Sequence, residues 1–160
     1  MLLSFGCNTD PVESEMPEIG FESVTVYKNI QGKDSMLVLS INYKDGDGDL
    51  GLSVGDTFPP YNFGSDGFYN LLVGYKIKKN NVWQSILVPG SSDTLQFNQR
   101  FQRLNLSDKK KMVSGNLDLR IPASPYPGVF PDTIKFISQM IDRKLHRSNV
   151  VESNEIKLKH

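Results

Sequence analysis

Apolar and polar residues alternate along several separate segments of this chain, and this alternation constrains its fold more than any other feature. In residues 37–43 every second side chain is apolar, and Ser40 and Asn42 are among the residues between them. Residues 69–78 and 112–121 show the same period of two. Because successive side chains of a strand point to opposite faces of a sheet, this period predicts strands with one buried face. No segment carries the apolar stripe of a long helix.

We predict the strands from this pattern and from the turn residues that separate them. They cover residues 19–27, 35–43, 69–78, 82–88, 112–121, 133–141 and 150–159. Asn80-Asn81 predicts a two-residue hairpin, because asparagine tolerates positive φ. Residues 94–106 fit helical as well as strand spacing, and we favour a strand followed by a connector. About seven or eight short strands in one domain predict an antiparallel β-sandwich of the immunoglobulin or fibronectin type III kind.

The charge balance and the residue inventory exclude several classes of function. Lys and Arg together number 18, as do Asp and Glu, so the net charge is zero and gives no electrostatic basis for binding nucleic acid. His146 and the terminal His160 are the only histidines, and no nucleophile is arranged around either of them. We therefore expect a non-enzymatic protein, and we separately expect it to be a monomer.

The single cysteine lies near the start of the chain, after a short apolar run. Cys7 follows MLLSFG and precedes a polar stretch, which looks like the end of a bacterial lipoprotein signal. Residues 1–7 are then the remnant of a truncated signal, residues 8–18 a flexible tether, and residues 19–160 the sandwich domain. Cys7 would carry the lipid that attaches the protein to a membrane. The alternative is an ordinary free cysteine.

Three aspartates alternate with two glycines directly after the predicted strand 35–43, in the motif YKDGDGDLG. In a sandwich of this kind, the loop after that strand and the loop after 133–141 emerge at the same end of the domain. Asp142 should therefore lie near Asp45, Asp47 and Asp49. Four carboxylates gathered without counter-charge repel one another, and Ca²⁺, which takes 6–8 oxygen ligands, would relieve that repulsion.

The motif matches a calcium-binding EF-hand loop only in part. Asp56 falls where the bidentate glutamate of an EF-hand would be, but Leu50 stands where its glycine should follow the third aspartate, and no flanking helices are predicted. We therefore reject an EF-hand and keep Asp45, Asp47, Asp49, Asp56 and Asp142 as candidate Ca²⁺ ligands. The alternative is that aspartate and glycine are simply good turn formers here, with the carboxylates capping loop amides.

Four aromatic residues follow the aspartates in the same long loop: Tyr61, Phe63, Phe68 and Tyr69. Aromatic rings stack on sugars and peptides, so these residues are candidates for binding a glycan or protein ligand. The alternative is that the loop folds its rings back over the open end of the sandwich.

Longer motifs connect the chain to a group of relatives: INYKDGDGDLG, YNLLVGYKIKKNNVW, KMVSGNLDLRIP and DTIKFISQMIDRKLHRSNVVESNEIKL. Together they resemble a group of small Bacteroidota lipoproteins of uncharacterised function. The resemblance covers nearly the whole chain from Cys7 onward and is most specific in DGDGDLG and DRKLHRSNVVES. It implies a single immunoglobulin-like sandwich on a lipidated cysteine, located in the cell envelope at the outer membrane. It identifies no ligand and does not say which side of that membrane carries the protein.

Overall fold

The computed structural model describes residues 14–104 and 111–160. Cys7, the predicted lipidation site, lies outside these residues, as does most of the predicted tether. Within the described residues the protein is all-β and contains no helix. Accordingly, no helix in this part of the chain is long and apolar enough to cross a membrane.

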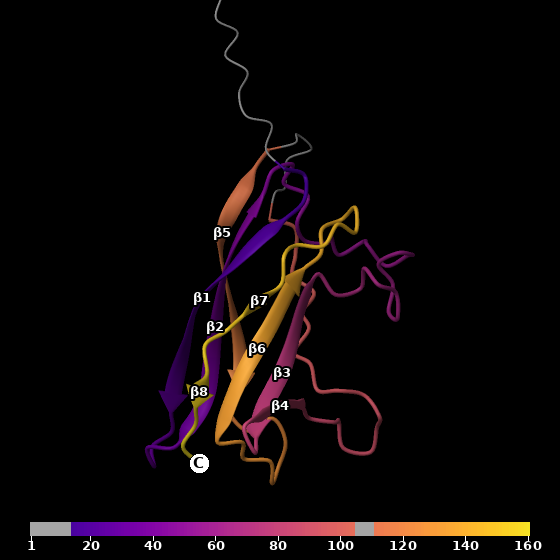
Figure 1. Cartoon of the computed structure of the whole chain (residues 1–160). Helices are drawn as coiled ribbons and strands as arrows, with labels where there is room; N and C mark the ends of the chain where they lie inside the picture. Colours follow the sequence, from indigo (N-terminus) through magenta and orange to yellow (C-terminus); the bar gives the residue numbers. More distant parts are fainter. Residues whose placement is uncertain (1–13, 105–110) are drawn as a thin grey trace, which may run out of the picture.

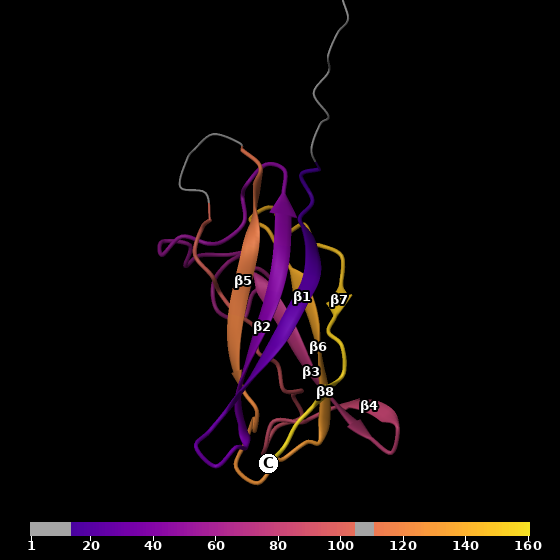
Figure 2. The ribbon, with the colours of Figure 1, turned by 90° about the vertical axis from the view of Figure 1, so that its left-hand side faces the viewer.

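In the described part of the chain, eight antiparallel strands form two sheets. The strands are β1 (Glu18–Lys28), β2 (Asp34–Asp45), β3 (Leu71–Lys79), β4 (Val82–Ser85), β5 (Val113–Pro122), β6 (Thr133–Met140), β7 (Val151–Glu152) and β8 (Ile156–Lys157). One sheet has the order β1-β2-β5, and the other has the order β4-β3-β6-β7, with β8 also paired to β6. Figure 2 shows β1, β2 and β5 in front of β3 and β6, so the two sheets are stacked as the layers of a β-sandwich.

The core lies between the two sheets and is built from the side chains that the alternation predicted. Its fully or almost fully buried members include Leu37, Leu39 and Ile41 of β2, Leu71, Val73 and Tyr75 of β3, and Ile134, Phe136 and Met140 of β6. Each such aliphatic or aromatic side chain stabilises the fold by about 1.5–3 kcal/mol relative to an exposed position. The all-β sandwich predicted from the sequence is therefore confirmed.

Local sequence features set two details of the strands. Asn80 and Asn81 have φ values of 52° and 60°, as a two-residue hairpin between β3 and β4 requires. Gly115 of β5 lies opposite Tyr43 of β2, and a Cβ there would be 2.8 Å from the tyrosine hydroxyl. The ring of Tyr43 thus covers the strand position that has no side chain of its own.

The second sheet departs from the prediction at its edge. The predicted strand 150–159 is divided into β7 and β8, because at Ser153 the side-chain hydroxyl, and not a backbone carbonyl, accepts the amide hydrogen of Phe136. The predicted strand 82–88 ends at Ser85, and the residues that follow pair with residues 93–95. Residues 96–99 run extended beside β3, which supports the strand interpretation of that segment.

Three segments from distant parts of the sequence meet at one end of the sandwich. The start of β1, the loop that follows β2 and the connection between β6 and β7 all lie at this end (Figure 1). The β1–β2 hairpin and the C-terminus lie at the other end. The prediction that the loops after residues 43 and 141 share one end is thus confirmed.

Candidate metal site

The three alternating aspartates converge where β2 ends. Asp45 is the last residue of β2, and Asp47 and Asp49 follow it in the loop. Gly48 has a φ of 70°, a left-handed conformation that glycine adopts without strain, and it reverses the chain between the second and third aspartate. As a result, one carboxylate oxygen from each aspartate lies within 4.8 Å of the others. Asp45 is fully buried, and Asp47 is 7% exposed.

Hydrogen bonds orient these carboxylates but do not satisfy all of their oxygens. The amide of Asp49 donates to Oδ2 of Asp45 over 2.9 Å. Oδ1 of Asp45 and Oδ1 of Asp49 are buried and accept no hydrogen bond from the described residues. A buried acceptor without a partner costs about 1–3 kcal/mol, so a fold that keeps two of them in one cluster favours a further partner at this point.

Burial and mutual repulsion make the charged form of the cluster unfavourable. Burial is the main cause that raises the pKa of Asp45 to about 6, with the nearby charge of Asp47 next in importance. Burial likewise raises the pKa of Asp49 to about 6, and the next cause is the charge of Asp142. Near neutral pH both carboxylates still ionise, so the cluster attracts a cation.

Asp142 lies beside this group, as the topology predicted. It is 3% exposed, and its charge acts on both Asp45 and Asp49. The amide of His146 donates to its Oδ1 over 2.8 Å, and Nδ1 of the same histidine lies 2.9 Å from its Oδ2. Burial raises the pKa of Asp142, and the contacts with His146 oppose that rise. Asp142 therefore adds negative charge at the edge of the cluster.

Asp56, the remaining predicted ligand, is not brought to this group. Its carboxylate forms an ion pair with the guanidinium of Arg143 and accepts the amide hydrogen of Ser53 over 2.6 Å. The hydrogen bond from Arg143 is the main cause that lowers the pKa of Asp56. Asp56 thus fastens the long loop to the β6–β7 connection instead of serving with Asp45, Asp47 and Asp49.

Lys144 supplies the positive charge that lies against the cluster. Its Nζ is 2.5 Å from Oδ2 of Asp47 and 2.8 Å from Oε2 of Glu15, which belongs to the segment before β1. These hydrogen bonds, to Asp47 first and Glu15 second, raise the pKa of Lys144. Neither Lys144 nor Glu15 is recognisable as part of a site from sequence, because a single lysine and a single glutamate in polar segments carry no pattern.

The donor set fits Ca²⁺ better than other common metal ions. All the candidate ligands are carboxylate oxygens, which hard cations prefer over the nitrogen and sulfur ligands of zinc sites. Ca²⁺ binds oxygens at 2.3–2.6 Å, so two oxygens on one ion are at most about 5 Å apart. The spread of up to 4.8 Å among the three aspartates satisfies that limit. Mg²⁺, with shorter bonds and a rigid octahedron, would require the group to contract or retain several waters.

The aromatic residues of the long loop lie beside the site on a braced backbone. The guanidinium of Arg100 donates to the carbonyls of Asp56, Tyr61 and Phe68 over 2.5, 3.2 and 2.9 Å. The ring of Phe68 lies edge-to-face against Phe63 and also against Tyr69.

The four predicted binding residues therefore divide into two kinds. Tyr61 and Phe68 are half-buried and lie under Arg143 and Arg100, which fits the capping alternative. Phe63 is 80% exposed and Tyr69 36% exposed. The sequence did not reveal the role of the two arginines, because each acts on residues far away along the chain.

Comparison with known protein families, curated proteins and solved structures gives no match for this chain.

Proposed function

We propose that this protein is a non-enzymatic domain of the bacterial cell envelope, held at the outer membrane by a lipid on Cys7, and that its Asp45–Asp49 loop binds Ca²⁺. The motifs that resemble Bacteroidota lipoproteins support the envelope location. The described N-terminal segment leaves the domain at the same end as the loop (Figure 1), so a lipid at Cys7 would hold that end toward the membrane.

One observation carries the calcium proposal. One carboxylate oxygen from each of Asp45, Asp47 and Asp49 lies within 4.8 Å of the others, and Oδ1 of the fully buried Asp45 has no hydrogen-bond donor among the described residues. Turn formation alone requires the hydrogen bond from the Asp49 amide to Asp45, but it does not require a second oxygen of Asp45 to be buried without a partner. A hard dication accounts for both features, because it binds oxygens directly and offsets their repulsion.

Calorimetric titration tests this proposal on the full chain at pH 7.5 after chelator treatment. We expect saturable binding of Ca²⁺ with a stoichiometry of about one, and a melting temperature that rises with its concentration, because a ligand that binds only the folded state stabilises it. Mg²⁺ at the same concentration serves as the comparison and should bind more weakly. The absence of heat and of any thermal shift at millimolar Ca²⁺ would refute metal binding.

The lipid anchor has its own test in a precursor that carries a complete signal sequence. We expect labelled palmitate to enter the wild-type protein in a bacterial host and the Cys7→Ser variant to remain unlabelled and to leave the membrane fraction. A wild-type protein without label would remove the anchor and leave the calcium proposal untouched.

A second candidate function is binding of a glycan or peptide at the long loop. The exposed fractions of Phe58 and Phe63, 77% and 80%, favour it, because large apolar side chains this exposed on a braced loop are suited to contact a partner. The edge-to-face rings of Phe63, Phe68 and Tyr69 offer no continuous flat platform, which favours a peptide over a stacked sugar.

A glycan array and a peptide library, each probed with the wild type and with Phe63→Ser, test this candidate. The matched control is Ile30→Ser, which changes a 98% exposed apolar residue at the opposite end of the domain. A selective signal that Phe63→Ser removes and Ile30→Ser retains would support loop binding. Equal signals for both variants would refute it.

A further inference from the structure

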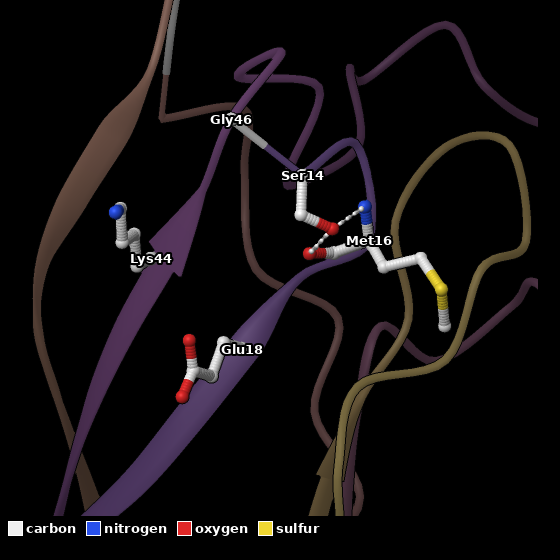
Figure 3. A pocket seen from close by; sticks show the side chains of 5 residues that line it. All are labelled: Ser14, Met16, Glu18, Lys44 and Gly46. Atoms are coloured by element: carbon white, nitrogen blue, oxygen red, sulfur yellow. Dashed lines mark hydrogen bonds between the residues drawn. The ribbon is translucent and has the colours of Figure 1, made fainter. Parts of the chain in front are cut away.

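The segment that precedes β1 lies directly against the aspartate loop. The amide of Gly46 donates to the carbonyl of Ser14 over 3.0 Å, and the Ser14 hydroxyl bonds with both backbone groups of Met16, which turns the segment toward β1 (Figure 3). Ser14, Met16, Glu18, Lys44 and Gly46 line a hollow of about 40 Å³ between the segment and the loop. The N-terminal segment is therefore part of the surroundings of the candidate metal site.

Lys144 connects this segment to the aspartates through a single ammonium group. It contacts Asp47 and Glu15 at the same time, so their two oxygens are no farther apart than these contact distances together, about 5.3 Å. Two oxygens on one Ca²⁺ ion are separated by up to about 5 Å. Glu15 thus lies within a small side-chain adjustment of the coordination distance, and its side chain is 52% exposed.

On the basis of the proposed calcium site, we propose that Glu15 is a further carboxylate ligand of the ion. In the absence of calcium the Lys144 ammonium lies between Glu15 and Asp47, and Ca²⁺ takes this position when it binds. The ion thereby fastens the segment Ser14–Glu18 to the Asp45–Asp49 loop. An ammonium and a hard metal cation are attracted by the same carboxylate oxygens, and the dication brings twice the charge. The Lys144 side chain is 39% exposed, so its ammonium moves into solvent when Ca²⁺ binds.

This arrangement makes the attachment of the N-terminal segment dependent on calcium. With Lys144 in place, the contacts of the segment with this side of the domain include an exposed ion pair, a class of interaction that solvent weakens, and the hydrogen bond from Gly46. With Ca²⁺ in place, Glu15 binds an ion that Asp45, Asp47 and Asp49 also hold. Because this segment leads toward the predicted lipid site, calcium would fix the end of the predicted tether that adjoins the domain.

Calcium affinity in matched variants of the full chain tests the role of Glu15. We expect Glu15→Gln to weaken Ca²⁺ binding about tenfold and Lys144→Gln to tighten it several-fold, because the first loses a ligand and the second loses the competing ammonium. Glu18→Gln is the control, since it removes an exposed acidic charge that lines the same hollow, whereas the carboxylates in contact with Lys144 are those of Glu15 and Asp47. A loss as large in Glu18→Gln as in Glu15→Gln would assign the effect to general electrostatics and overturn the inference.

Amide hydrogen exchange of the segment Ser14–Glu18 provides an independent test of its attachment by Ca²⁺. In the wild type, the amides of Met16 and Gly46 should exchange at least several-fold more slowly with Ca²⁺ than with chelator, and Glu15→Gln should abolish this difference.

The outcomes separate the two proposals. If the wild type binds Ca²⁺ but Glu15→Gln binds equally well and exchange at Met16 does not change, the role of Glu15 is refuted and the calcium site stands. If the wild type binds no Ca²⁺, the calcium site itself is refuted.

Discussion

Substitution of Asp45 by asparagine should change stability in opposite directions with and without calcium. Burial and the charge of Asp47 raise the pKa of Asp45 from 3.8 to about 6. A carboxyl group whose folded-state pKa is raised destabilises the fold progressively as pH rises from about 4 to about 6, and the full cost remains above that range. A shift of roughly two units corresponds to about 3 kcal/mol.

Asparagine removes this cost while keeping the local geometry. Its side-chain oxygen still accepts the hydrogen bond from the Asp49 amide, and its volume is nearly the same. In chelator at pH 7.5, Asp45→Asn should therefore raise the free energy of unfolding by up to about 3 kcal/mol, or the melting temperature by about 6–12 °C for a domain of this size. At pH 4 this advantage should almost disappear, because the wild-type carboxyl is then protonated in the folded state.

Calcium should reverse the advantage by stabilising only the wild type. At a concentration one thousand times the dissociation constant, Ca²⁺ adds about 4.1 kcal/mol to a protein that binds it in the folded state alone, which exceeds the advantage of the variant. Asp45→Asn lacks a buried ligand and should gain little. Chemical denaturation at pH 4 and pH 7.5, with chelator and with Ca²⁺, gives the four free energies needed for each protein.

The control is Asp66→Asn, which makes the same chemical change at an exposed position of the long loop. It should alter stability by less than about 0.5 kcal/mol under all four conditions. A wild type more stable than Asp45→Asn in chelator at pH 7.5, or a difference between them that does not depend on pH, would refute the electrostatic argument.

Two further predictions concern the loop that carries the site. Gly51→Ala should destabilise the domain by at least about 2 kcal/mol, because Gly51 has a φ of 88° and a Cβ there would lie 2.3 Å from the carbonyl oxygen of Gln102. Thermal denaturation measures the effect, and the control is Gly55→Ala, because a Cβ at Gly55 meets nothing within 4 Å. Equal melting temperatures for the two variants would contradict the close approach. Arg100→Met should leave three loop carbonyls without their charged donor and make the segment 53–69 cleave at least several-fold faster under limited proteolysis, and unchanged cleavage would show that the loop is held by other contacts.

The strands and their buried faces follow from local chemistry, which the sequence records directly. The period of two in residues 37–43 places Leu37, Leu39 and Ile41 on one apolar face of the strand, and that face is the one that the sandwich buries. Asn80-Asn81 determines its own hairpin, since asparagine tolerates the positive φ that the turn requires. Strand termini depend on less local events, and the division of the last strand at Ser153 follows from one side-chain hydroxyl replacing a backbone acceptor.

The candidate site was only partly contained in the sequence. Spacing and topology together were enough to bring Asp142 toward Asp45 and Asp49, because both loops end strands that stop at the same edge of the sandwich. Spacing alone was misleading for Asp56, which is bound by Arg143.

Only the tertiary structure decided which cationic side chains lie against which carboxylates. Asp56 and Arg143 are 87 positions apart, and Lys144 and Glu15 are 129 positions apart. Such pairs depend on the path of two loops and on the rotamers at their ends, and neither quantity has a periodic signature along the chain. The sequence by itself determined a sandwich with an acidic loop at one end, whereas the packing of distant loops determined which cationic side chains lie against its carboxylates.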